Sequence, residues 1–184
     1  LDYRSNGGGI MQEAVKILSM FVPKGTEVVS MRGRMKELDA TFVTQSEPID
    51  TQIPVAVLIN SSSASAAEIV AGAFQDLDRG VLLGQRSFGK GLVQSTRPVG
   101  YNAYLKLTTA KYYTPSGRCI QAIDYSHRAE DGSVGTVPDS LIKEYATKAG
   151  RKVYDGGGVM PDIRMPDNYY SRFTNVLYGK GYIE

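Results

Sequence analysis

A buried strand, a helix and a second buried strand follow one another between residues 54 and 84, and this order constrains the fold more than any other feature of the chain. Pro54–Asn60 contains a continuous apolar run of strand length, which is typical of a strand buried on both faces. A helical apolar pattern begins near Ser65, and Val81–Gly84 is a second short apolar strand. The short links predict a parallel βαβ unit with a right-handed crossover.

Antiparallel strands are predicted on both sides of this unit. Glu27–Met31 and Leu38–Val43 have the composition of strands and are joined by a polar stretch, which indicates a hairpin. After the unit, three segments alternate like antiparallel strands, and the last two meet at a turn over Thr114–Gly117. These three segments are Leu92–Arg97, Tyr104–Tyr113 and Arg118–Ala122. We therefore expect an α/β fold with an added antiparallel strand region.

The remaining segments predict one strand, two helices and loops. Leu1–Arg4 is expected to be a short strand, and apolar residues recur at helical spacing from Ile10 onward. Asp124–Gly135 is polar and is expected to be a loop. Asp139–Ala149 shows helical periodicity, with its first residue as the N-cap. No internal repeat is visible, so we expect one domain.

The composition is that of a soluble globular domain, and the net charge does not indicate a strongly charged partner. The chain has 184 residues, of which 42% are hydrophobic and 22% charged, and these values are ordinary for such a domain. A formal net charge of +2 gives no electrostatic reason to expect nucleic acid or an anionic membrane as a partner. No apolar run approaches the roughly 20 residues that span a bilayer. We predict no nucleic-acid partner and no membrane-spanning segment, whereas the oligomeric state stays open.

The chain offers few ligands for metals or redox chemistry. Cys119 is the only cysteine, so no internal disulfide can form, which fits a reducing compartment without excluding an oxidising one. Its position favours a small core residue in a strand over a reactive thiol. His127, the only histidine, lies in a charged segment and is expected to be solvated. One histidine and one cysteine cannot build a typical zinc site, and we expect no metal and no cofactor.

The tetrapeptide Ser65-Ala66-Ala67-Glu68 opens the predicted helix directly after the buried strand. Taken alone, it favours a capping box, in which the serine and the glutamate three residues later satisfy free amides. The same place suits a nucleophile, because a helix N-terminus offers free N–H groups and a positive dipole end to an oxyanion. The small side chains of Ala64 and Ala66 leave room for a peptide to approach.

Lys90 is the best candidate for the base that a nucleophilic serine needs. Lysine replaces histidine in Ser–Lys hydrolases, provided that burial lowers its pKa from about 10.4 toward 7–8. Lys90 follows the strand Val81–Gly84, has glycines on both sides, and has Phe88 nearby to exclude water. By spacing alone, an exposed lysine on a surface turn fits equally well.

The segment Gly84–Lys90 also matches the phosphate-binding pattern G-x-x-x-x-G-K. That pattern requires Ser or Thr at the next position to hold magnesium, and Gly91 stands there instead. It also requires a helix after the loop, whereas Leu92–Arg97 is predicted to be a strand. Both departures argue against nucleotide binding.

Five sequence blocks occur in one order and span nearly the whole chain. They cover residues 1–9, 63–73, 88–94, 107–117 and 158–163 and carry LDYRSNGGG, SASAAEIVAGA, FGKGLVQ, LTTAKYYTPSG and GVMPDI. Together they resemble the C-terminal processing peptidases, also called tail-specific proteases. The resemblance implies a fold of the crotonase and Clp protease type. It also implies a serine endopeptidase that hydrolyses peptide bonds near the C-termini of protein substrates.

The resemblance also implies roles for the residues that match the family's motifs. The serine of the S-A-S-A block corresponds to Ser65, the lysine of F-G-K-G to Lys90 and the glutamine of V-Q to Gln94. They would act as nucleophile, general base and the group that orients the lysine. On a strand, Lys90 and Gln94 would face the same side. The family's oxyanion hole implies the backbone N–H groups of Ala66 and Gly8.

The chain departs from the family's pattern in three places. Gly7 stands where the family usually has proline, and residues 123–153 form a longer connection than usual, an insertion of unknown role. The family's PDZ domain and helical segment, which precede the core, are absent before Leu1. We therefore expect residues 1–184 to be a catalytic core from a longer protein, inactive or poorly active alone. By resemblance, the parent acts in the bacterial cell envelope, in the periplasm.

A non-catalytic peptide- or ligand-binding module on the same fold is the alternative function. The fold occurs in binding proteins without peptidase activity, as the resemblance implies. The intact set of Ser65, Lys90 and Gln94 favours the enzyme. A decayed enzyme would have no reason to keep all three.

Overall fold

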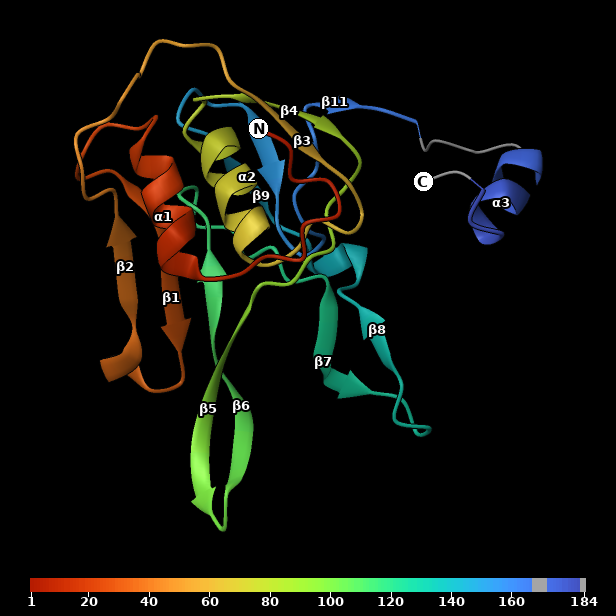
Figure 1. Ribbon diagram of the computed structural model, residues 1–184. Coiled ribbons are helices and arrows are strands. Elements are labelled where there is room, and N and C mark those ends of the chain that lie inside the picture. The colour runs from red at the N-terminus through yellow and green to blue at the C-terminus, as the bar shows by residue number, and fades with distance from the viewer. Residues whose placement is uncertain (167–171, 183–184) are drawn as a thin grey trace.

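The centre of the fold is a parallel βαβ unit (Figure 1). β3 (Ala56–Ile59) and β4 (Val81–Gly84) are parallel neighbours, and α2 (Ala66–Asp76) connects them. This confirms the strand–helix–strand unit that the sequence predicts. The computed structural model that contains it describes residues 1–166 and 172–182.

Short pieces from both ends of the chain extend this parallel sheet. β11 (Ile163–Arg164) pairs in parallel with β4. On the other side, Asp2 forms a single parallel bridge to Leu58 of β3. The predicted strand Leu1–Arg4 is therefore reduced to one bridge, because the chain turns at its end. The last described helix is α3 (Arg172–Gly179).

A four-stranded antiparallel sheet in the order β2-β1-β6-β5 lies beside the parallel unit. Its strands are β1 (Glu27–Gly33), β2 (Ala40–Val43), β5 (Leu92–Gly100) and β6 (Ala103–Tyr113), and η1 (Lys36–Leu38) joins the first two. The predicted hairpin of β1 and β2 is confirmed, and the antiparallel strands expected over residues 92–97 and 104–113 are found as β5 and β6. The β5–β6 hairpin projects from the body (Figure 1). Its tip residues Tyr101 and Asn102 have φ of 49° and 57°, as in the two-residue turns that match strand twist.

The hydrophobic core lies between the helices and the sheets. α1 (Met11–Ser19) begins after Ile10, as the periodicity predicts, and contributes Leu18 to the core. Leu18, Phe74 and Leu82 are completely buried. Each such side chain stabilises the fold by about 1.5–3 kcal/mol through loss of water contact.

The prediction of a strand at Arg118–Ala122 is wrong, because this segment pairs with turns instead of with another strand. Ala122 N–H donates to Gly89 O at 2.9 Å. The Arg118 guanidinium, 1% exposed, pairs with Asp76 at 2.8 Å and fastens the segment to the end of α2. The hydrogen bonds of residues 118–122 thus go to several different partners, and the segment forms no β-ladder with another strand.

The prediction of a polar loop at Asp124–Gly135 is also wrong. β7 (Ile123–Arg128) and β8 (Val134–Thr136) form an antiparallel hairpin with an irregular register. This hairpin projects from the body, and most of its side chains are exposed. Its residues are therefore mainly polar, and the sequence shows no strand pattern. Alternation of apolar and polar residues appears only when one face is buried.

The predicted helix over Asp139–Ala149 is replaced by a single 3-10 turn and a strand. η2 (Asp139–Leu141) has Pro138 as its N-cap rather than Asp139. β9 (Glu144–Ala146) then pairs with β10 (Lys152–Tyr154). A tertiary pairing with a later segment therefore overrides the local helical periodicity, as often happens in short segments.

Candidate active site

Ser65 is the N-cap residue of α2 and has an unusual backbone conformation. Its φ is 58° and its ψ −119°, outside the β region that N-cap residues normally adopt. A positive φ is uncommon for residues other than glycine, and such strained positions cluster at active sites and ligand clamps. Capping alone does not require this strain, so the backbone favours a functional serine.

The turn between β3 and α2 that carries Ser65 is held on two sides. Ser63 is fully buried, its Oγ donates to Tyr3 O at 2.7 Å, and it accepts the Asn60 N–H at 2.9 Å. Ala64 N–H donates to Asn6 O at 2.9 Å. These bonds fix the N-terminal segment against the serine turn.

The predicted oxyanion donors lie next to each other. Gly8 has a φ of 97°, and a Cβ added there would lie 2.7 Å from Ser65 Cβ and 2.9 Å from Ala66 N. Only glycine therefore allows this approach. Ala66 N–H donates no hydrogen bond within the described residues, as expected in the first turn of a helix. Gly8 N–H, in contrast, donates to Asn6 Oδ1 at 2.9 Å.

One buried carboxylate joins the serine turn to the lysine turn. Glu68 is completely buried, and its Oε2 accepts the N–H groups of Ser65 and Lys90, each at 2.8 Å. Its Oε1 accepts Ser87 Oγ–H at 2.5 Å and Gly89 N–H at 2.7 Å. The backbones of Ser65 and Lys90, distant in sequence, thus meet at one oxygen atom.

The carboxylate of Glu68 suits this place because all four partners are donors and an ionised carboxylate only accepts. Burial raises the pKa of Glu68, and the four hydrogen bonds act in the opposite direction. The sequence indicates this residue only as a helix cap, through its local bond to Ser65. Its bonds to residues 87–90 depend on the tertiary fold and leave no sequence signal.

Lys90 lies in the turn between β4 and β5, and the glycines beside it are fastened to the segment that follows β6. Gly89 O accepts the Ala122 N–H at 2.9 Å, and Gly91 N–H donates to Gln121 Oε1 at 2.8 Å. A Cβ on Gly91 would lie 2.8 Å from Gln121 N. The flanking glycines thus permit a close approach, as expected. A strand and not a helix follows the turn, so the phosphate-loop geometry is absent here.

The side chains of the predicted catalytic set are less close than their backbones. Lys90 is exposed, whereas a neutral base requires burial. Among the described residues, no hydrogen bond joins Ser65 Oγ to Lys90 Nζ, or Lys90 Nζ to Gln94. Lys90 also precedes β5, so strand alternation does not relate it to Gln94. Catalytic hydrogen bonds are often long in the absence of substrate and tighten when it binds.

A cavity of about 740 Å³ lies beside the lysine turn. Lys90 and Gln94 both line it, whereas Ser65 does not. Cys119 also lines the cavity; it is partly exposed and lies in no strand, which corrects the expectation of a core strand residue. Burial raises the pKa of the Cys119 thiol. His127 is exposed, as expected, and contacts Asp124 at 2.7 Å.

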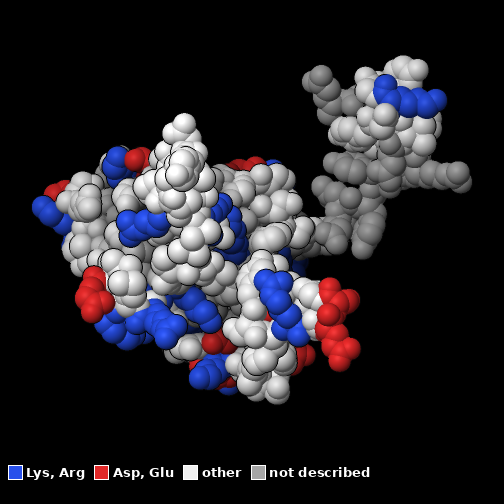
Figure 2. Space-filling view, turned by 90° about the horizontal axis from the view of Figure 1, so that it is seen from below, with Lys and Arg blue, Asp and Glu red and all other residues white. Residues whose placement is uncertain are grey.

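Charges and candidate metal ligands do not gather into a further site in the described part of the chain. Within it, no group of three or more His, Cys, Asp or Glu residues is placed to hold a metal ion. None of the helices described has the length and apolarity to span a membrane. Figure 2 shows basic and acidic side chains together on the face from which the hairpins project, so neither sign covers it.

The mixed α/β fold is of the class to which the Clp-protease-like serine peptidases belong, and this confirms the predicted fold class. The chain itself belongs to peptidase family S41, whose family model matches residues 1–139. The match ends within the 123–153 segment. Family membership confirms the resemblance to the C-terminal processing peptidases.

Three similar proteins support this assignment. The carboxy-terminal-processing protease of Bartonella bacilliformis is 44% identical over 144 residues, which are 78% of this chain and 30% of that protein. The carboxyl-terminal-processing protease of Synechocystis is 34% identical, again over 78% of this chain and 30% of its own. The structure of the photosystem II D1 C-terminal processing protease has 28% identity and a TM-score of 0.66, covering 91% of this chain and 34% of that one. The chain thus spans about a third of the length of these relatives.

Proposed function

We propose that this chain carries the catalytic core of a serine endopeptidase that cuts protein substrates near their C-termini. Ser65 is the nucleophile, Lys90 the general base, and Gln94 orients the lysine amine. The single observation that carries this proposal is the strained, positive-φ backbone of Ser65 at a helix N-terminus, beside the unpaired N–H of Ala66. The names of the relatives support the reaction class.

The reaction begins when Ser65 Oγ attacks the substrate carbonyl carbon and a neutral Lys90 accepts the hydroxyl proton. The C–N bond then breaks, and Lys90 returns the proton to the leaving amine. Water hydrolyses the resulting acyl-serine. The N–H groups of Ala66 and Gly8 stabilise the oxyanion in both steps.

Asn6 occupies one of the two proposed oxyanion donors before substrate binds, because its Oδ1 accepts the Gly8 N–H. The amide oxygen stands where the oxyanion would receive its hydrogen bond. The substrate therefore displaces the Asn6 side chain, and Gly8 N–H exchanges one oxygen acceptor for another. A fixed donor that needs no new backbone movement is what electrostatic stabilisation of a transition state requires.

The exposure of Lys90 means that the substrate has to remove water from its amine. A peptide lying over the cavity covers Lys90 and removes water from its amine. Lys90 therefore becomes an effective general base only when a substrate peptide is bound.

The family relationship supports a proposal for the location and the substrates. We propose that the parent protein acts in the bacterial cell envelope, in the periplasm, as the resemblance implies. Its substrates are proteins with accessible C-terminal tails. The chain spans about a third of the length of its relatives.

Substitutions in the full-length protein test the catalytic set. Ser65→Ala and Lys90→Ala should each lower cleavage of a tailed protein substrate by more than about a thousandfold. Lys106→Ala, an exposed lysine of β6 outside the cavity, should leave cleavage unchanged. Retained cleavage in either catalytic variant contradicts the assignment. Tight binding of tailed substrates by a wild-type protein that never cleaves them would instead favour the non-catalytic binding module.

A further inference from the structure

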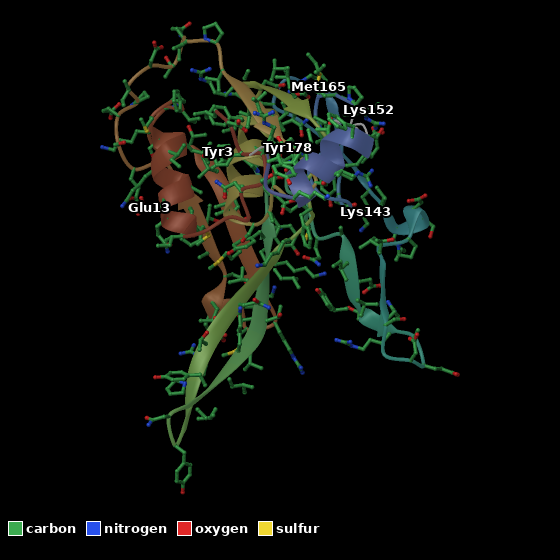
Figure 3. All side chains as sticks on the ribbon, turned by 45° about the vertical axis from the view of Figure 1, so that its right-hand side comes forward. Tyr3, Glu13, Lys143, Lys152, Met165 and Tyr178 are labelled. Carbon is green, nitrogen blue, oxygen red and sulfur yellow. The ribbon has the colours of Figure 1, made fainter. Side chains whose placement is uncertain are left out.

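The 123–153 segment forms one side of the cavity beside Lys90. From this segment the cavity is lined by Ile123, Asp124, Tyr125, Ser126, Val137 and Leu141. The opposite side comes from the lysine turn and from β5 and β6, which contribute Phe88, Leu92 and Thr108. In Figure 3 the β7–β8 hairpin and the β5–β6 hairpin project in the same general direction, and the labelled Lys143 lies where the segment returns to the core.

This side of the cavity is fastened to the lysine turn itself. Ala122, the residue before β7, donates its N–H to Gly89 O, and its own O accepts the Val137 N–H at 2.8 Å. Gln121 bonds to Gly91 on the other side of Lys90 at 2.8 Å. The segment therefore keeps a fixed position relative to Lys90.

Three polar side chains on this side, those of Gln121, Asp124 and Asp155, already have partners within the chain. Asp124 accepts the Ser126 N–H at 2.9 Å and contacts His127 at 2.7 Å. Asp155 accepts the Lys143 N–H at 2.7 Å, and Gln121 Nε2 donates to the carbonyl of Ile123 at 3.0 Å.

Large apolar side chains, in contrast, stand open around the cavity. Phe88 is 50% exposed, Tyr125 49% and Leu141 57%. Exposed apolar side chains that gather around a hollow mark binding sites for apolar groups. A cavity of about 740 Å³ is within the usual range for ligand pockets, roughly 300–1,000 Å³, and has room for more than one side chain.

We propose that residues 123–156 form a specificity-determining wall of a pocket that receives apolar side chains of the substrate beside the scissile bond. The proposal rests on the proposed function, because Lys90 at the edge of the pocket connects it to the reaction. Residues next to the cut are then selected for apolar character. The wall begins within the family match and continues past its end at residue 139, where Leu141 is its next lining residue.

A substitution pair on the wall tests this in the full-length protein. Tyr125→Ala combined with Leu141→Ala removes exposed apolar surface from the pocket without touching the core. The matched control is Tyr154→Ala, which is also 49% exposed and lies in the same segment outside the cavity. Peptides that differ only in Leu, Phe or Ser beside the cut are compared by kcat/KM.

The wall variant should lose about tenfold or more of the preference for Leu and Phe over Ser, as expected for lost apolar contact. The control should keep the wild-type preference. Labelling of Ser65 by a small fluorophosphonate should remain unchanged in both variants, so a loss of specificity is distinguished from a loss of chemistry. An unchanged preference in the wall variant overturns the proposal.

Cys119 provides a second measurement that does not depend on catalysis. Because Cys119 lines the cavity and is partly exposed, a bound peptide should shield its thiol from a maleimide. Peptide mass spectrometry follows the modification at Cys119. A Leu-rich peptide should slow modification several-fold in the Ser65→Ala protein, and a Ser-rich peptide of equal length should not. Equal protection by both peptides, or protection that persists in the wall variant, contradicts an apolar pocket at this place even if the protein is no peptidase.

Discussion

At the scale of single residues, Asn6 and Glu68 each place an oxygen atom at a point that the proposed chemistry uses. Asn6 Oδ1 accepts the Gly8 N–H, which is reserved for the oxyanion in the proposed mechanism. Glu68 holds the backbones of Ser65 and Lys90 at one oxygen atom. Neither residue reacts. Asn6 holds the Gly8 N–H in position until substrate binds, and Glu68 fixes the distance between the backbones of the nucleophile and the base.

Glu68→Gln should destabilise the full-length protein by about 3 kcal/mol. The carboxamide has one acceptor oxygen and one donor NH₂ group, so in either orientation at least one backbone N–H group would face a donor inside the core, that of Gly89 or those of Ser65 and Lys90. Chemical denaturation measures the loss. Glu13→Gln, an exposed α1 residue paired only with Lys16, should cost less than about 0.5 kcal/mol. A similarly small change for Glu68→Gln would mean that the carboxylate does not hold the two turns.

At the scale of elements, the β9–β10 hairpin is fastened to the turn after α2. Asp78 accepts the Ala149 N–H at 2.5 Å and pairs with Arg151 at 2.6 Å. Burial alone would raise the pKa of Asp78, but these hydrogen bonds together hold it below its ordinary value of 3.8. The far end of the 123–156 wall is thereby held against the core.

Asp78→Asn should make the free energy of unfolding depend less on pH in the acid range. Because the folded-state pKa of Asp78 is lowered, its contribution is present above about pH 4 and is lost as the pH falls through the folded value. Wild type should be more stable than the variant by about 1 kcal/mol at neutral pH, and the difference should shrink as the pH falls below the ordinary Asp value of 3.8 and through the lowered folded-state pKa. Asn tolerates the positive φ of this position, 53°. Stability profiles from urea denaturation that stay parallel for the two proteins from about pH 7 down to about pH 2 would contradict this account.

The elements that the sequence predicts correctly carry their own periodicity or a tight turn. α2 and the strands beside it follow from apolar runs and short links, and the β1–β2 hairpin and the antiparallel strands β5 and β6 follow from strand composition and alternation. Residues 118–149 could not be predicted in this way. Arg118 is buried against Asp76, and β9 pairs with β10, so partners distant in sequence decide both structures.

At the scale of the whole molecule, three segments far apart in sequence assemble the candidate site. The Asn6–Gly9 turn, the start of α2 and the Ser87–Gln94 segment each contribute part of it. The sequence motifs predict which residues take part, because each block is locally recognisable. They do not predict the Glu68 junction or the outer wall of the cavity, since both exist only through contacts between the blocks.

The identity of the reactive serine and its base is the central claim, and active-site labelling of the full-length protein tests it most directly. A fluorophosphonate should form an adduct on Ser65, located by peptide mass spectrometry, and Lys90→Ala should slow this labelling by more than about a hundredfold. Lys106→Ala should label at the wild-type rate. An adduct at another residue, or an unchanged labelling rate in Lys90→Ala, would contradict the account.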